Sequence, residues 1–209
     1  MFTSDKPTNY EKVYQELIPR LAAADLAGNA AALGLERQGE DVIAPVFGRR
    51  FIVGAAGVRQ ADGQPGGMIH RIALAYYLTH GGNGQPAGRF APYRELPGGA
   101  DFARSLGQIV DARIAQSFSG RTATLEAACL ALGGRGLAGQ EISCDVGHVF
   151  EALPKIPMML TFYDADDEFP AEAKVFYDAA APNFLDLECL ASLGMILALE
   201  LERAAEALG

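Results

Sequence analysis

Apolar side chains recur every three or four residues in several parts of the chain, which is the spacing of an amphipathic helix. The first helix starts at a capping-box sequence, Thr8–Glu11, and Pro19 is expected to kink or end it because proline lacks the backbone N–H. Asp25 can cap a second, short helix that stops at Gly34. Further helices are predicted over residues 68–80, 102–118 and 122–132, and from Asp186 toward the C-terminus.

Short apolar runs bounded by glycine, proline or charged residues predict the strands. Residues 41–47 and 51–57 flank Gly48-Arg49-Arg50 and predict a β-hairpin, in which Pro45 favours an edge position or a bulge. Other strands are predicted over residues 89–96, 146–153, 157–163 and 174–177. Because helices and strands do not alternate strictly, we expect an α+β fold with a mixed or mostly antiparallel sheet packed by N- and C-terminal helices.

At 209 residues, the length favours one domain over residues 1–209. This domain would consist of an N-terminal helical segment, 1–34, and an α+β core, 35–209. Two glycine-rich loops interrupt it, at 60–67 and 81–88. The second loop follows a helix, whereas the glycines of a dinucleotide-binding loop precede one, so we expect a mobile loop or lid there.

The net charge of −9 comes from one part of the chain, because residues 164–209 hold 11 acids and two bases. An acidic chain without a basic patch excludes nucleic acid as the main partner. The most apolar run, 189–199, has 11 residues and is too short to span a membrane. The three cysteines have no metal-site spacing and are expected to be reduced and buried, so we expect a cytoplasmic protein.

Four acids crowd a short stretch of this acidic region: Asp164, Asp166, Asp167 and Glu168. They do not form an EF-hand, because Phe169 and Val175 stand where that loop needs Gly and Glu. A magnesium site or a catalytic carboxylate pair would use one or two of these acids. The simpler interpretation, which we favour, is a solvated turn between two strands, since Asp is a common turn residue.

Arg94 and Glu95 precede a glycine turn that leads into a helix, Pro97-Gly98-Gly99. Backbone N–H groups at such a helix start can hold an anion, with Arg94 as a bidentate clamp. Alternatively, Arg94 forms an ion pair with the 164–168 acids and joins strand to loop. His70, His80 and His148 are isolated, and none has the spacing of a metal site.

Eight segments resemble those of one protein family, in one order along nearly the whole chain. They are Tyr10–Tyr14 (YEKVY), Ala75–Thr79 (AYYLT), Arg94–Gly99 (RELPGG), Leu132–Gly134 (LGG), Leu153–Pro157 (LPKIP), Asp166–Pro170 (DDEFP), Phe176–Asp178 (FYD) and Leu185–Glu188 (LDLE). The chain resembles an uncharacterised bacterial and archaeal family, the domain of unknown function 3786. It departs from the family at Tyr163, where relatives tend to have Trp, and at Asp186 and Cys189, which leaves Glu188 as the matching acid.

The resemblance implies little chemistry. Some relatives look like fusions to a cysteine-rich iron–sulfur module of the kind found in corrinoid iron–sulfur proteins. This chain has no such module, so a redox role implied by the resemblance would need a separate redox, corrinoid or iron–sulfur partner.

Two functions are expected from these observations. One is an accessory or small-ligand-binding module that acts with such a partner, with Arg94, Gly98, Gly99, Asp178 and Glu188 as candidate binding residues. The other is a small enzyme that uses an Arg/carboxylate cluster of Arg94, Glu95, Asp167 and Glu168, with or without a divalent metal held by the 164–168 acids. The cofactor and the oligomeric state are left undetermined.

Overall fold

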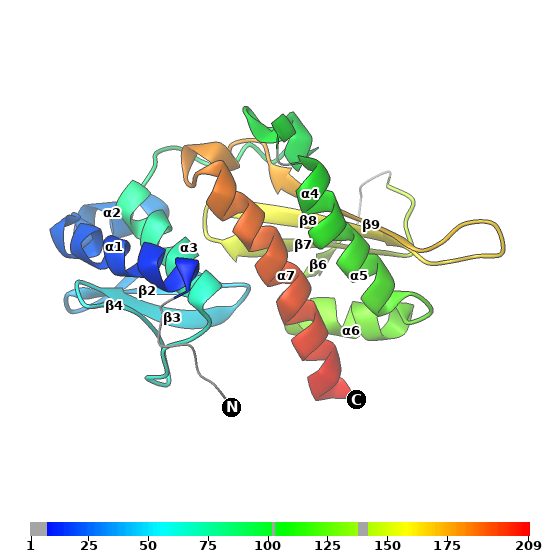
Figure 1. Ribbon diagram of the computed structural model, residues 1–209, viewed down its shortest axis with the longest axis horizontal. Coiled ribbons are helices and arrows are strands. Elements are labelled where there is room, and N and C mark those ends of the chain that lie inside the picture. The colour runs from blue at the N-terminus through cyan, green and yellow to red at the C-terminus, as the bar shows by residue number, and fades with distance from the viewer. Residues whose placement is uncertain (1–7, 102, 138–141) are drawn as a thin grey trace.

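The computed structural model describes residues 8–101, 103–137 and 142–209, which fold into two antiparallel sheets with helices against them (Figure 1). The N-terminal sheet is a meander in the order β1 (Glu36–Gln38), β2 (Asp41–Val46), β3 (Arg49–Gly54) and β4 (Gly57–Gln60). The C-terminal sheet has the order β5 (Phe90–Pro92), β9 (Glu172–Asp178), β8 (Ile156–Tyr163), β7 (Val146–Leu153) and β6 (Arg135–Gly136). The expected α+β class with antiparallel pairing is confirmed, and the strands divide over two sheets.

The helices fall into two groups. In the N-terminal half, α1 (Asn9–Ala23), α2 (Leu26–Leu33) and α3 (Met68–His80) lie against the meander (Figure 1). In the C-terminal half, α4 (Ala103–Ile109), α5 (Asp111–Phe118), α6 (Thr122–Ala131) and the long α7 (Leu187–Leu208) pack with the second sheet and with one another. Short 3₁₀ turns, η1 (Tyr93–Glu95), η2 (Gly99–Asp101) and η3 (Ala181–Asn183), complete the fold.

Local capping sets the helix starts where the sequence predicted them. Thr8 accepts from the N–H of Glu11, and the carboxylate of Glu11 accepts from the N–H of Thr8, as the capping box requires. Asp25 caps α2, and α2 ends at Gly34 in the left-handed conformation. However, α1 does not end at Pro19 but continues to Ala23.

Two prolines stand where the strand pairing is limited. Pro45 lies in β2 between β1 and β3, yet β1 pairs only with residues 41–43, so Pro45 is at a local edge as predicted. The strand predicted over 89–96 is limited to β5, because the chain turns into η1 directly after Pro92. That turn buries Tyr93.

The helix predicted over 102–118 is divided into α4 and α5 at Val110; residue 102 lies outside the described residues. Hydrogen bonds continue across the division, from the N–H of Val110 to the carbonyl of Leu106 and from the N–H of Ile114 to that of Val110. The division is therefore a local irregularity in one helical rod.

A continuous hydrophobic core joins the two halves. The N–H of Phe47 donates to the carbonyl of Ala152 at 3.1 Å, which ties the β2–β3 turn to β7. The helix α7 crosses between the two halves, with α3 on one side and α5 and α6 on the other (Figure 1). Within the described ranges, no helix combines the length and the apolar character needed to cross a membrane.

Candidate functional site

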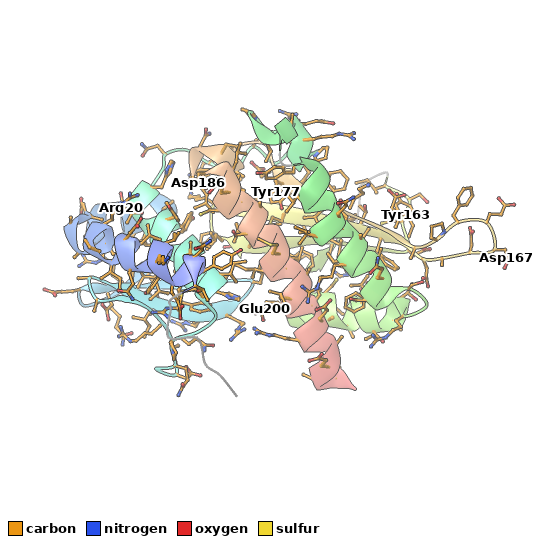
Figure 2. The ribbon with its side chains drawn as sticks, in the orientation of Figure 1. Arg20, Tyr163, Asp167, Tyr177, Asp186 and Glu200 are labelled. Atoms are coloured by element: carbon orange, nitrogen blue, oxygen red, sulfur yellow. The ribbon has the colours of Figure 1, made fainter. Side chains whose placement is uncertain are left out.

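The acids of residues 164–168 form the tip of the β8–β9 hairpin, which projects away from the body of the protein and carries Asp167 near its outer end (Figure 2). Asp164 accepts from the N–H of Gly120 at 2.7 Å, and Asp166 accepts from the N–H groups of Glu168 and Phe169 at 2.8 and 2.7 Å. These two N–H groups lower the pKa of the exposed Asp166. Asp164 thus ties the hairpin to the α5–α6 loop, and Asp166 closes the turn.

These carboxylates do not converge. Among the residues that the structure describes, no group of three or more His, Cys, Asp or Glu side chains could hold a metal ion. The geometry of the turn matches the solvated-turn alternative better than the metal site proposed for Asp164, Asp166, Asp167 and Glu168.

Arg94 and Glu95 lie on η1, at a distance from that turn. Pro92 pairs with Phe176, whereas the hairpin tip begins beyond the pair Tyr163–Glu172. Four residues of β9 separate the two positions, about 13 Å at the usual rise per residue. Instead, Arg94 approaches its neighbour Glu95 at 3.9 Å, and both side chains are exposed. The structure therefore does not bring the Arg/carboxylate cluster together, nor does it pair Arg94 with the turn.

The remaining predicted binding residues, Gly98, Gly99 and Glu188, lie near the start of α7. Gly98 has a positive φ of 83°, and a Cβ there would lie 3.0 Å from Leu187. A Cβ at Gly99 would collide with the carbonyl of Tyr93. Glu188 is exposed in the first turn of α7. The glycine pair is therefore required by close packing between η1, η2 and the start of α7.

Asp178 is fully buried, and its carboxylate accepts three backbone N–H groups. They belong to Ala87 and Gly88, at 2.8 and 2.7 Å, and to Ala180, at 2.8 Å. The carboxylate thus fixes the end of the 81–88 loop to the end of β9, so this end of the predicted lid is anchored.

A cleft of about 450 Å³ opens between η1, the α4–α5 rod and the edge of β9. This size is within the range of small-molecule sites. Its walls are mainly apolar and include Pro92, Tyr93, Leu106, Val110, Val175, Phe176 and Tyr177. Arg94 and Lys174 also line it, and both side chains are partly exposed. One predicted residue, Arg94, therefore lies at a cleft.

Among the described residues that line this cleft, Asp111 is the one with a carboxyl group. Its Oδ1 accepts from the N–H of Val175 at 3.2 Å. Burial raises the pKa of Asp111 to about 6, against the lowering effects of the Val175 N–H and of Lys174. An acid of nearly neutral pKa in an apolar cleft can donate or accept a proton at physiological pH.

Two tyrosines form the inner wall of the cleft. The ring of Tyr93 meets that of Tyr177 edge-to-face, with centroids 5.7 Å apart, and the Tyr93 hydroxyl donates to the carbonyl of Leu187 at 2.8 Å. The hydroxyl of Tyr177 is buried against Gly194 of α7, without a hydrogen-bond partner in the described chain. Burial and the nearby Asp111 raise the pKa of Tyr177, so it stays neutral.

Replacing Asp111 with Asn is expected to stabilise the protein at pH 7. An acid whose folded pKa is raised costs stability as pH rises from its unfolded pKa, about 3.9, through its folded value near 6. The Asn side chain keeps an oxygen for the Val175 N–H without the charge. We expect a gain on the order of 1–3 kcal/mol at pH 7 in denaturant unfolding, which disappears near pH 4. A loss of stability at pH 7 in Asp111→Asn, in place of this gain, would contradict this account.

Sequence reasoning missed Asp111, although a signal was present. Asp111 stands three, four and seven residues before the buried Ile114, Ala115 and Phe118, and thus on the apolar face of its helix. An acid on an apolar face is the pattern that could have found it.

The cysteines, His148 and His80 lie outside the cleft. Cys129 and Cys189 are free and buried, as predicted, whereas Cys144 is only half-buried. His148 is buried with Nε2 2.9 Å from the carboxylate of Glu126, and His80 is exposed at the end of α3.

Comparison with known proteins gives one match. No significant match to a curated protein or to a solved structure was found. The family model described as a domain of unknown function (DUF3786) matches residues 25–200, from the cap of α2 into α7. That match covers most of the chain, and the protein therefore belongs to the DUF3786 family.

Proposed function

We propose that the protein is a small-ligand-binding module whose site is the cleft between η1, the α4–α5 rod and β9. The observation that carries this proposal is the partly buried Asp111 in an apolar cleft of about 450 Å³. Apolar walls with a few placed polar groups are typical of small-molecule sites, and perturbed carboxyl groups concentrate at functional sites.

The residues of the cleft favour one class of ligand. Tyr93, Leu106 and Val175 offer apolar surface for a ring or a short branched chain. Arg94 and Lys174 offer positive charge for a carboxylate or similar anion on the ligand. When protonated, Asp111 can donate a hydrogen bond to the ligand. We therefore propose a small organic acid with an apolar body.

Gly107 provides a direct test because it lines the cleft on α4. Among the side chains that the structure describes, a Cβ added there meets only the Oδ2 of Asp111, at 3.7 Å, which is ordinary van der Waals distance. The variant Gly107→Leu should therefore fill the cleft, and its replacement of a helical glycine should not lower stability. Ligand-observed NMR with a library of aromatic and branched-chain carboxylic acids should show that some of these acids bind the wild type. The same acids should bind Gly107→Leu at least tenfold more weakly.

A matched control is Gly136→Leu, on the short edge strand β6, where an added Cβ meets no atom of the described residues within 4 Å. This variant should bind as the wild type does. If no acid binds the wild type, or if Gly107→Leu binds as well as Gly136→Leu, the cleft is not the ligand site.

A catalytic role is a second candidate, and the pKa of Asp111 near 6 favours it. In this case Asp111 would exchange a proton with a ligand whose charge is held by Arg94 or Lys174. In this alternative, the carboxyl group of Asp111 takes the catalytic role that was predicted for the cluster of Arg94, Glu95, Asp167 and Glu168. Turnover of a bound acid that is abolished in Asp111→Asn, while binding is kept, would separate catalysis from binding.

We also propose that the module works in the cytoplasm with a redox, corrinoid or iron–sulfur partner. Support for the partner comes from the resemblance to relatives that look fused to an iron–sulfur module. Support for the compartment comes from the three free cysteines, which suit a reducing environment. A pulldown from the native host with the tagged protein should recover such a partner, and recovery of none would count against this part of the proposal.

A further inference from the structure

An open hollow in the surface, of about 550 Å³, lies at the β4–α3 loop, on the N-terminal half of the protein. We call it the loop site. It is lined by Arg49, Gln60, Gln64, Pro65, Gly66, Gly67 and Arg203. The walls of the loop site are polar, in contrast to the apolar cleft at Asp111. Binding at the loop site does not depend on that cleft.

Two arginines from distant parts of the chain meet at the loop site. Arg49 comes from β3, and its Nη1 donates to both carboxylate oxygens of Glu200, at 2.7 and 2.9 Å, while Nη2 donates to Gln60 at 2.5 Å. Arg203, one turn after Glu200 on α7, donates to Glu200 at 3.0 Å. Glu200 thus holds both guanidinium groups in place.

Charge at the loop site is net positive. Glu200 has a side chain that is 7% exposed, and both its oxygens are covered by the arginines, whose side chains are 39% and 57% exposed. Two positive charges therefore face one covered negative charge. The nearest loop acid, Asp62, accepts from the N–H of Gln64 at 2.9 Å.

The loop also supplies the start of a long helix. Gly66 and Gly67 precede α3, which has 13 residues and no side-chain cap at Gly67. The N–H groups of its first turn have no intrahelical acceptor, and with the helix dipole they favour an anion. Gly66 has a φ of 73°, and a Cβ there would lie 3.0 Å from the Phe51 ring, so glycine is required.

His70 adds an unpaired polar atom beside this helix start. Its ring is 2% exposed and stacks on Phe51, with Nε2 3.1 Å from the carboxylate of Glu200. Its Nδ1 has no hydrogen-bond partner in the described chain and would lie 3.0 Å from a Cβ on Gly67. Both ring nitrogens of His70 have almost no exposed surface, and His70 is not among the residues that line the loop site, so its ring lies behind the site against Glu200 and the helix start.

We propose that the loop site binds the phosphate group of a small molecule. The two guanidinium groups and the first-turn N–H groups of α3 bind the phosphate oxygens, because planar arginine forks and helix starts both suit this anion. The order strand, glycine-rich loop and helix, which phosphate sites use, is present here at residues 57–80.

Isothermal titration calorimetry tests this with three probes: inorganic phosphate, glycerol 3-phosphate and acetate. We expect the two phosphates to bind at least tenfold more tightly than acetate. Stronger binding of glycerol 3-phosphate than of inorganic phosphate assigns a phosphate ester; the reverse order assigns the free ion. In two-dimensional NMR, the amides of residues 66–69 should shift on addition of phosphate.

Arg203→Gln should weaken phosphate binding at least tenfold, and Arg49→Gln should do the same. The matched control is Arg50→Gln, since Arg50 follows Arg49 on β3, faces the other side and pairs with Glu36. It should bind within twofold of the wild type. Arg203→Gln decides the result if Arg49→Gln is unstable, because an exposed ion pair contributes little to folding. Failure of both phosphates to bind at millimolar concentration, equal binding of acetate, or unchanged affinity in Arg203→Gln would overturn the proposal.

Discussion

Replacing Glu200 with Gln is expected to lower the free energy of unfolding by about 3 kcal/mol at pH 7. Removing the charge of one member of a buried ion pair leaves the other uncompensated, which typically costs 3–5 kcal/mol. Here the cost is reduced because Arg49 is partly exposed. The loss should be visible in urea unfolding, and it is large because Glu200 joins β3 and α3 to α7.

The pH dependence of this effect has a definite sign. Burial alone would raise the pKa of Glu200, but its hydrogen bonds with His70 and Arg49 lower it to about 2. A folded pKa below the unfolded value, about 4.3, gives stability that is present above pH 5 and lost as pH falls toward 2. The difference between wild type and Glu200→Gln should therefore shrink between pH 5 and pH 2. A difference that stays constant over this range would show that the charge of Glu200 does not stabilise the fold.

Replacing Asp178 with Ala is expected to cost about 3–4 kcal/mol. The change removes one buried carboxylate and leaves three backbone N–H groups without their acceptor. Hydrogen bonds to charged groups contribute about 1.5–3 kcal/mol each, and three on one carboxylate are not additive. Denaturant unfolding measures the loss. Amide hydrogen exchange should accelerate at Ala87, Gly88 and Ala180 in a conservative Asp178→Asn variant that stays folded.

The matched control is Asp167→Ala at the exposed hairpin tip, which should change stability by less than about 0.5 kcal/mol. Asp167 and Asp178 were both candidate functional acids in the sequence, and the structure gives them opposite surroundings. Similar stability losses for the two variants would contradict the structural role assigned to Asp178.

Much of the fold could be predicted because its signals are local. The Thr8 and Asp25 caps, the Gly34 stop and the hairpin around Gly48 all act over a few residues, and each lies where the sequence placed it. The division of the strands into two sheets could not be predicted, since it depends on long-range pairing. The end of β5 at Pro92 was missed because the burial of Tyr93 decides it.

The candidate site was harder to predict than the fold. The high density of acids suggested a site at residues 164–168. The sequence alone does not show that a hairpin holds these acids away from Arg94. Asp111 is a single acid in a helix, and its raised pKa comes from α4, α5 and β9 packing around it. The family resemblance was confirmed, yet it carried no chemistry that would have identified this cleft.

The most direct test of the cleft is an NMR titration of the side-chain carboxyl carbon of Asp111 in the wild type and in Gly107→Leu. We predict a midpoint near pH 6 in the wild type, as burial in the cleft requires. In Gly107→Leu the midpoint should be higher still, because the new side chain lies against Oδ2 and excludes water from it. A midpoint near 4 that is the same in both proteins would mean that Asp111 faces bulk water, and it would contradict the account of the cleft as a ligand site.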